Sequence, residues 1–279
     1  DIDWASIDLV TGGFPCQAWS MAGKQLGDKD ERGMLFWVML DIMKHVKHCN
    51  PKADFLIENV KMKKEFEQYI TTHTENALGH VHKILINSAL VSAQNRNRYY
   101  WTSFEVDQPE DRGILLQSIL QSVLESKYYH TEKAMSYMNR AVKGGRTHFE
   151  FGHHSDTGFS KSSCITANMF KGVPYNLIID RDKSRCISSS IGRTTPREYY
   201  KKNQDALAVY TFDDDNPHLC RKLTPRECMR LQTVPEHHID TLLNAGISNT
   251  QLYKMCGNGF TIDVIAHIFK CMITSCEFE

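Results

Sequence analysis

Short apolar runs alternate with stretches of helical periodicity through the first hundred residues, and no other feature of the chain constrains its fold as strongly. Apolar residues recur at helical spacing over residues 34–46, and Pro51 prevents this helix from continuing. Helical spacing returns over residues 63–77. Four other runs have the length and composition of strands: residues 7–11, 55–57, 80–87 and 98–104. Strands separated by helices of this length predict an α/β sandwich built on a largely parallel sheet.

The chain changes character after about residue 104. Residues 130–220 are rich in Gly, Ser, Thr, Asn and His, with short β-prone pieces at 175–180 and 206–212. This composition predicts a second, smaller and irregular domain.

Helical patterns resume near the C-terminus. A helix is expected over residues 224–232. Thr224 suits its N-cap, Pro225 its first helical position and Glu227 the N3 position of a capping box. A last amphipathic helix is expected over residues 262–272, after a Gly-Asn-Gly sequence.

The 279 residues have the composition of an ordinary globular protein, enough for one large domain or for a large domain with a smaller companion. No apolar run has the length of a membrane span and no secretory signal opens the chain, so we expect a cytoplasmic or nucleoid-associated protein. Nine cysteines without a C-x-x-C pair favour reduced thiols over a disulfide framework.

Charge is distributed unevenly although the formal net charge is zero. Residues 133–202 contain 13 Lys and Arg against 5 Asp and Glu. A basic segment inside a neutral protein suits a localised contact with a polyanion. A solvated surface that happens to be basic explains these charges equally well.

The strongest local motif is GFPCQAWSMAG, residues 13–23, directly after the first expected strand. Ligands of open α/β sheets bind at loops beyond the carboxyl ends of the strands. Cys16 therefore lies where a nucleophile would be exposed, although cysteine more often packs as a small apolar residue. Both interpretations of Cys16 are open on position alone.

Two more polar motifs follow expected strands. Glu58 ends the strand at 55–57, at the same sheet edge as Cys16, where it could act on a substrate, cap a helix or pair with a nearby lysine. In QNRNR, residues 94–98, Arg96 and Arg98 are two apart, so on a strand they would point to one face. Two guanidiniums on one face can grip a carboxylate or phosphate, or simply lie on the surface.

These motifs, in this order, resemble those of the DNA cytosine-5 methyltransferase family. GFPCQ matches its nucleophile loop, ENV its glutamate motif and QNRNR its Q-x-R-x-R motif, while RKLTPRECMRLQ and GNGF match its last two motifs. The resemblance implies a Rossmann-like S-adenosylmethionine-dependent methyltransferase sheet with a smaller, irregular target recognition domain. We place the catalytic domain at residues 1–107 plus 248–279 and the recognition domain at 108–247.

The resemblance also implies a covalent mechanism on double-stranded DNA. Cys16 would add to C6 of a flipped-out cytosine, and Glu58 would contact N3 and the exocyclic amine. Arg98 would support the glutamate and the base, with Arg96 assisting nearby. The matching loop positions that would approach the DNA backbone are Gln17 and Ser20.

The implied methyl donor is S-adenosyl-L-methionine. The positions matching its pocket are Pro15, Leu35, Asn258, Gly259 and Phe260, although Leu35 also fits the core face of its helix. Base and phosphate readout would come from two stretches that mix hydroxyl, amide and cationic groups. Their candidate DNA-binding residues are Thr166, Asn168, Lys171 and Arg193. No metal site is predicted, since the histidine pairs at 153–154 and 237–238 lack partnered cysteines.

The family's N-terminal Phe-x-Gly-x-Gly cofactor loop has no counterpart here, nor do the first three strands of its sheet. Three explanations are open: a truncated chain, an N-terminal partner chain that supplies the motif, and a decayed copy. We expect this chain alone to bind the cofactor weakly. Three other functions stay open: tRNA cytosine-5 methylation, a non-catalytic DNA-binding or regulatory subunit, and a thiol hydrolase, which would leave the ENV, QNRNR and Gly-Asn motifs unexplained.

Overall fold

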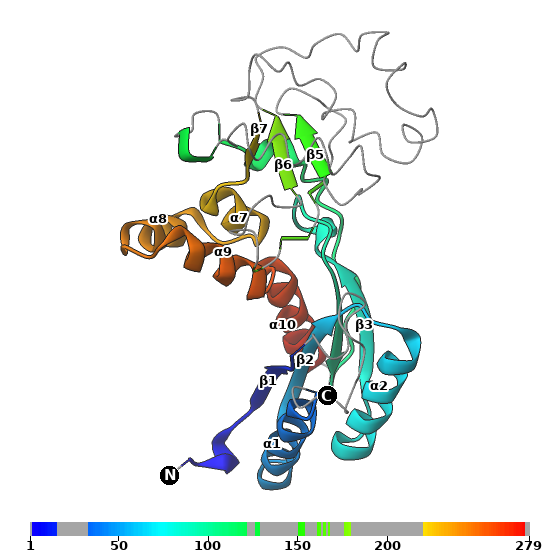
Figure 1. The fold of residues 1–279 in the computed structure, drawn as a ribbon. Helices are drawn as coiled ribbons and strands as arrows, with labels where there is room; N and C mark the ends of the chain where they lie inside the picture. The colour runs from blue at the N-terminus through cyan, green and yellow to red at the C-terminus, as the bar shows by residue number, and fades with distance from the viewer. Residues whose placement is uncertain are drawn as a thin grey trace. The chain divides into compact units, whose positions relative to one another are not determined.

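The computed structural model describes residues 2–15, 33–121, 126–128, 150–153, 161–162, 164–165, 167, 176–179 and 220–276. The chain divides into two compact units (Figure 1). The first comprises Asp1–Asn87, Asn97–Pro109 and Val264–Glu279, and the second comprises Ser88–Arg96 and Glu110–Asp263. The functional division at residues 107 and 248 stays a prediction.

A four-stranded sheet organises the first unit, in the order β1-β2-β4-β3. Its strands are β1 (Leu9–Gly13), β2 (Asp54–Val60), β3 (His82–Asn87) and β4 (Asn97–Thr102). The α/β architecture is confirmed, and β1 and β2 are parallel as expected. The expectation of a largely parallel sheet is wrong for β4, which runs antiparallel to both of its neighbours. The connection between β3 and β4, residues 88–96, is too short for the crossover that would be needed to make the two strands parallel.

Two helices share one hydrophobic core with the sheet. They are α1 (Leu35–Cys49) and α2 (Lys64–Leu78). The core residues come from α1, α2, β2 and β4 and include Phe36, Leu40, Met43, Ile70, Phe55, Ile57 and Trp101. A short 3-10 helix, η1 (Trp4–Ser6), precedes β1, and the Trp4 ring packs edge-on against His45 of α1.

The buried face of α1 differs from the one that its apolar pattern suggests. Leu35, Val38 and Ile42 are each about half exposed, whereas Phe36, Leu40 and Met43 are buried. Apolar residues cover more than one side of this helix, so periodicity alone offers two candidate stripes and packing against the sheet selects one. The alternative that Leu35 belongs to the core is therefore wrong.

Helices dominate the described part of the second unit. They are α7 (Pro225–Leu231), α8 (Glu236–Asn244) and α9 (Asn249–Asn258), with 3-10 helices η4 (Ser88–Leu90), η5 (Leu116–Ile119) and η6 (Ser126–Tyr128). Their core includes Leu116, Ile119, Leu223, Cys228, Leu231, Ile239, Leu252 and Tyr253. A small sheet has the order β5-β6-β7, formed by Glu150–His153, Asn176–Ile179 and Cys220–Lys222. The strand expected at 175–180 is confirmed as β6, and the piece at 206–212 lies outside the described residues.

The capping box of α7 is present as predicted. Thr224 Oγ1 accepts from the Glu227 backbone N–H at 3.2 Å, and Glu227 Oε2 accepts from the Thr224 N–H at 2.8 Å. The last helix, α10 (Ile262–Cys276), begins at the expected residue and buries Val264 and Ile268. None of the helices in the described part of the chain has the length and apolar character needed to span a membrane.

Candidate functional site

The carboxylate of Glu58 lies beside the end of β1. Because β1 and β2 are parallel, Gly13 is the register partner of Glu58, and the chain continues from there through Phe14 and Pro15. A Cβ at Gly13 would lie 3.2 Å from the Glu58 carbonyl oxygen and 3.7 Å from its carboxylate Oε2. The absence of a side chain at Gly13 thus leaves room beside this carboxylate. Cys16, Gln17 and Ser20 lie outside the described residues.

Arg98 forms an ion pair with Glu58. The Arg98 Nε and Glu58 Oε1 atoms are 2.9 Å apart, and both side chains are more than four-fifths buried. The antiparallel pairing of β2 and β4 places Arg98 opposite Val60, two residues beyond Glu58 and therefore on the same face of the sheet. Arg98 Nη1 also donates to its neighbouring carbonyl, of Asn97, at 2.9 Å. A guanidinium held in this way orients one carboxylate oxygen and compensates its charge.

Asn59 fastens the beginning of the loop that leads to Cys16. Its side chain is buried, and Nδ2 donates to the Phe14 carbonyl at 3.0 Å while Oδ1 accepts from the Val60 N–H at 2.8 Å. The Phe14 ring packs against Phe36, with centroids 4.9 Å apart. Within this motif the sequence points to Glu58 alone as a site residue, although an amide inside an apolar strand is a signal for a buried hydrogen-bonding role of Asn59.

Arg96 has a different environment from Arg98. It precedes β4 and lies in the second unit, where its buried guanidinium donates to the carbonyls of Ile165 at 3.1 Å, Gly257 at 3.1 Å and Gly259 at 2.8 Å. The expectation that Arg96 and Arg98 project from one strand face is therefore wrong, since β4 begins only at Asn97. Carbonyls left unpaired at the end of α9 attract the Arg96 guanidinium instead.

A buried polar network connects three of the motifs inside the second unit. Gln94 Nε2 donates to the Leu231 carbonyl at 3.1 Å and to Gln232 Oε1 at 3.3 Å. Gln232 Nε2 in turn donates to the Cys256 carbonyl at 2.5 Å, and Thr261 Oγ1 donates to Gln232 Oε1 at 2.9 Å. Gln232 Nε2 also donates to the Gly259 carbonyl at 3.3 Å, so the QNRNR, RKLTPRECMRLQ and GNGF motifs are parts of one hydrogen-bonded assembly.

This assembly holds the predicted cofactor residues at the end of α9. Gly259 N donates to the Met255 carbonyl at 2.8 Å, and a Cβ at Gly259 would lie only 2.9 Å from that oxygen. Asn258 and Phe260 on either side are exposed. In the first unit, Leu35 is exposed and Pro15 partly so. The side chains of Asn258, Phe260, Leu35 and Pro15 are thus all at least partly accessible to a ligand, and their role in cofactor binding stays a prediction.

The predicted readout residues Thr166, Asn168, Lys171 and Arg193 lie outside the described residues. Lys161, in the same basic segment, is bound to the backbone of its own unit. Its Nζ donates to the carbonyls of Ala89 at 2.7 Å, Ser92 at 2.9 Å and Ile114 at 2.6 Å. Burial lowers the pKa of Lys161, an effect that Asp111 partly opposes. This cation of the basic segment therefore stabilises the fold and is not presented to a polyanion.

Comparison with known proteins gives consistent results. The family model for C-5 cytosine-specific DNA methylases matches residues 1–274. The chain is 31% identical to the Type II methyltransferase M1.ScrFI of Lactococcus lactis subsp. cremoris, covering 97% of this chain and 63% of the relative. It is 27% identical to M.SsoII of Shigella sonnei, with 97% and 65% covered. The chain thus spans less than two thirds of the length of these two relatives.

Solved structures show the same fold at lower sequence identity. The S. pombe Dnmt2 methyltransferase matches with a TM-score of 0.63 at 18% identity, over 99% of this chain and 84% of that protein. A mutant of the Spodoptera frugiperda DNMT2 matches with a TM-score of 0.63 at 21% identity, over 95% of this chain and 79% of that protein. These likenesses confirm the expected Rossmann-like α/β fold.

Proposed function

This chain belongs to the family of C-5 cytosine-specific DNA methylases, and from that premise we propose that it transfers a methyl group from S-adenosylmethionine to C5 of cytosine in DNA. The observation that carries the proposal is the Glu58–Arg98 ion pair beside the end of β1. Cys16 follows this strand end by three residues in the chain. Covalent addition to a pyrimidine ring needs a nucleophile, and a fixed carboxylate beside it could hold the base in place.

Each step of the proposed reaction assigns a task to a residue of this chain. The Cys16 thiolate adds to C6 of the flipped-out base, while Glu58 contacts N3 and the exocyclic amine and so holds the ring. Addition makes C5 nucleophilic, and C5 takes the methyl group, which the cofactor supplies as an electrophile. Loss of the C5 proton then expels the Cys16 thiolate and leaves 5-methylcytosine.

The positioning residues act before any bond forms. Arg98 binds Oε1 of Glu58 and thereby fixes the orientation of the carboxylate. The other oxygen, Oε2, then lies close to Gly13 at the end of β1. Asn59 holds the Phe14 carbonyl and thereby fixes the beginning of the nucleophile loop. Such preorganisation lowers the cost of reaching the transition state because the groups need not be ordered during the reaction.

The residues assigned to the cofactor suit an adenosyl group chemically. Leu35 and Phe260 present apolar surface that is 48% and 44% exposed, respectively, and Asn258 offers an exposed amide. An adenine ring packs on apolar side chains and accepts and donates hydrogen bonds at its edge. Gly259 would allow the backbone to approach the ligand closely.

We also propose that further strands extend the sheet beyond β1. Among the strands that the structure describes, β1 pairs with β2 alone, which leaves its outer edge available for pairing. Leu35, Val38 and Ile42 form an exposed apolar stripe on α1, which packs against β1. Unpaired edges and apolar stripes of this kind are normally covered. The same polypeptide or a partner chain could supply the cover.

A covalent trapping experiment tests the function. The chain is incubated with S-adenosylmethionine and DNA carrying 5-fluorocytosine, alone and with the N-terminal region of a relative. Fluorine at C5 blocks the loss of a proton, so we expect a denaturation-resistant protein–DNA adduct that disappears in Cys16→Ser. Cys49→Ser, which changes a cysteine on α1, is the matched control and should retain the adduct.

Other outcomes point to other functions. An adduct on tRNA but not on DNA would identify the substrate as RNA. No adduct under any condition would contradict the enzymatic proposal and favour a non-catalytic DNA-binding subunit. With DNA as the substrate, we expect the protein to act at the nucleoid.

A further inference from the structure

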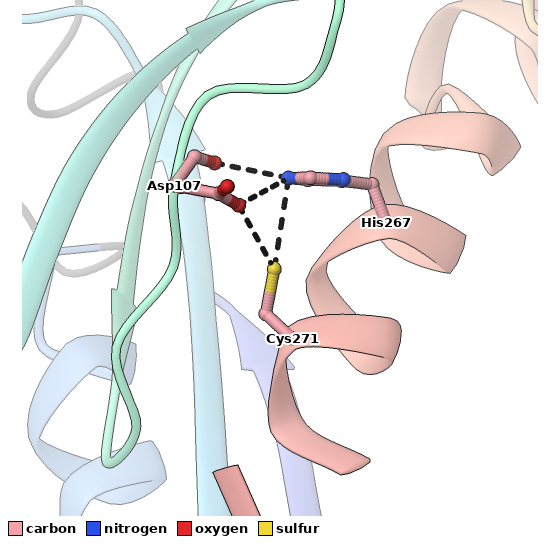
Figure 2. A group of neighbouring side chains, drawn as sticks. All are labelled: Asp107, His267 and Cys271. Atoms are coloured by element: carbon pink, nitrogen blue, oxygen red, sulfur yellow. Dashed lines mark hydrogen bonds and ion pairs between the residues drawn. The ribbon is translucent and has the colours of Figure 1, made fainter. Parts of the chain in front are cut away.

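Three potential metal ligands converge in the first unit, and none of them belongs to the motifs discussed so far. Asp107 follows β4, and His267 and Cys271 lie one turn apart on α10, so that both face Asp107 (Figure 2). Their three ligand atoms, Asp107 Oδ1, His267 Nε2 and Cys271 Sγ, all lie within 4.8 Å of one another. It is the one such group among the residues that the structure describes.

The separations of these atoms match a metal's coordination sphere. His267 Nε2 lies 3.1 Å from Asp107 Oδ1 and 3.6 Å from Cys271 Sγ, and Sγ lies 3.2 Å from Oδ1. With Zn–N and Zn–O near 2.0 Å and Zn–S near 2.3 Å, tetrahedral geometry requires about 3.3 Å for N···O and about 3.6 Å for S···N and S···O. Shifts of a few tenths of an ångström would therefore admit the ion.

The same geometry is unsuited to a catalytic triad. In a triad the histidine uses its two ring nitrogens for two different partners. Here one nitrogen, Nε2, faces the carboxylate and the thiol, and it also lies 3.0 Å from the Asp107 backbone carbonyl oxygen (Figure 2). Three donors directed at one point describe a site for a cation more closely than a relay of protons.

We propose that Asp107, His267 and Cys271 form a binding site for a transition-metal ion of the Zn²⁺ class. Thiolate and imidazole together select such ions over Mg²⁺ and Ca²⁺, which prefer oxygen ligands. The ion displaces the thiol proton of Cys271 to solvent and takes the Nε2 lone pair of a neutral His267 that carries its proton on Nδ1. The Asp107 side chain is 81% exposed, so water has access to a fourth position.

The site would fasten the last helix to the segment that follows β4. Asp107 and His267 are 160 residues apart in sequence, and Cys271 contacts the same carboxylate. An ion bound to all three therefore joins two segments of the first unit that are far apart in sequence, and binding to the folded state alone raises thermal stability. This proposal is independent of the proposed methyl transfer, since its ligands include none of the residues assigned to that reaction.

Cobalt spectroscopy on the full chain tests the site. After treatment with a chelator, Co²⁺ alone is titrated in, and we expect one equivalent to give the visible bands of tetrahedral Co²⁺ with a thiolate-to-cobalt charge-transfer band in the near ultraviolet. Zn²⁺ should displace it. Cys271→Ser should abolish the charge-transfer band, and His267→Gln or Asp107→Asn should weaken binding by about tenfold or more.

The chain contains a matched control for this experiment. His45 and Cys49 on α1 have the same spacing, with Sγ and Nε2 3.8 Å apart, but among the described residues no carboxylate completes the set. Cys49→Ser should keep the spectrum and the rise in melting temperature with Zn²⁺. A charge-transfer band that survives Cys271→Ser, or no band in the wild type, would overturn the proposal. Unchanged melting of each metal-free variant excludes misfolding as the cause.

Discussion

At the level of single residues, Asn59 and Glu58 are neighbours with different tasks. Asn59 is buried in β2 and supports the backbone at Phe14, whereas Glu58 and its partner Arg98 present charge at the strand end. Asn50 offers a comparison, because its Nδ2 donates to the Ile7 carbonyl at 3.0 Å, just before the other end of β1. The two amides thus anchor opposite ends of one short strand.

We predict that Asn59→Ala and Asn50→Ala separate loop positioning from strand anchoring. Each substitution leaves a carbonyl without its amide donor and should lower the free energy of unfolding, by about 1–3 kcal/mol for the buried Asn59 and by less for Asn50. Only Asn59→Ala should also slow formation of the 5-fluorocytosine adduct. Equal adduct rates in the two variants, measured at saturating DNA, would contradict the positioning role.

The two arginines of QNRNR should respond oppositely to substitution. Arg96→Gln removes the donor to three carbonyls in a buried site and should destabilise the protein by about 3 kcal/mol or more in denaturant unfolding. Arg98→Gln removes the ion pair with Glu58, which is more than four-fifths buried, but it keeps an amide at this position, so it should destabilise the protein less than Arg96→Gln while adduct formation slows. The reverse ranking of the two variants would refute the assignment of structural and site-supporting roles.

At the level of elements, the short helix α7 depends strongly on its N-terminal cap for stability. Seven residues form a marginal helix on their own. Glu227 is fully buried and accepts from the backbone of Thr224 and of Gln121, while Thr224 Oγ1 also donates to Gln121 Oε1 at 2.6 Å. The capping box therefore joins α7 to the segment after η5.

We expect Thr224→Ala to cost about 1–2 kcal/mol of unfolding free energy, because the cap and the bond to Gln121 are lost together. Ser248→Ala is the control. Ser248 caps α9 through a single, exposed bond to the Gln251 N–H, so its loss should cost about 0.5–1 kcal/mol. Urea unfolding followed by circular dichroism measures both, and equal losses would contradict the buried connection to Gln121.

At the level of the whole molecule, the motifs are divided between two units. Glu58 and Arg98 belong to the first, while Gln94, Arg96 and Gln232 build the second. The buried network of the second unit includes the Cys256 carbonyl, and burial raises the pKa of the Cys256 thiol to about 12. This thiol should therefore stay neutral and unreactive while the protein is folded.

Stability should consequently fall in alkali. A thiol whose pKa is raised on folding contributes its full stability below its unfolded pKa of about 9 and loses it as the pH rises towards 12. Between pH 8 and pH 10 the loss amounts to about 1.4 kcal/mol for this group. Cys256→Ala should lack that increment. Identical pH profiles of unfolding for wild type and variant, or rapid alkylation of Cys256 in the native protein, would contradict this.

Much of the molecule could be predicted from local sequence. The helices α1, α2, α7 and α10, the first four strands and the capping box follow from periodicity and capping chemistry, which act over a few residues. The order of five motifs identified the family without reference to any contact. The short connection from β3 to β4 even contained the signal for an antiparallel return, although alternation of elements pointed to a parallel one.

Tertiary structure alone decided which of several locally equivalent choices is realised. It selected the Phe36 face of α1 over the Leu35 face, gave Arg96 to carbonyls at the end of α9, and brought Asp107 to α10. These outcomes depend on packing and on unpaired polar groups contributed by distant segments, to which a local pattern is insensitive. Local chemistry determined the elements and the family of this protein, and long-range packing determined which side chains meet.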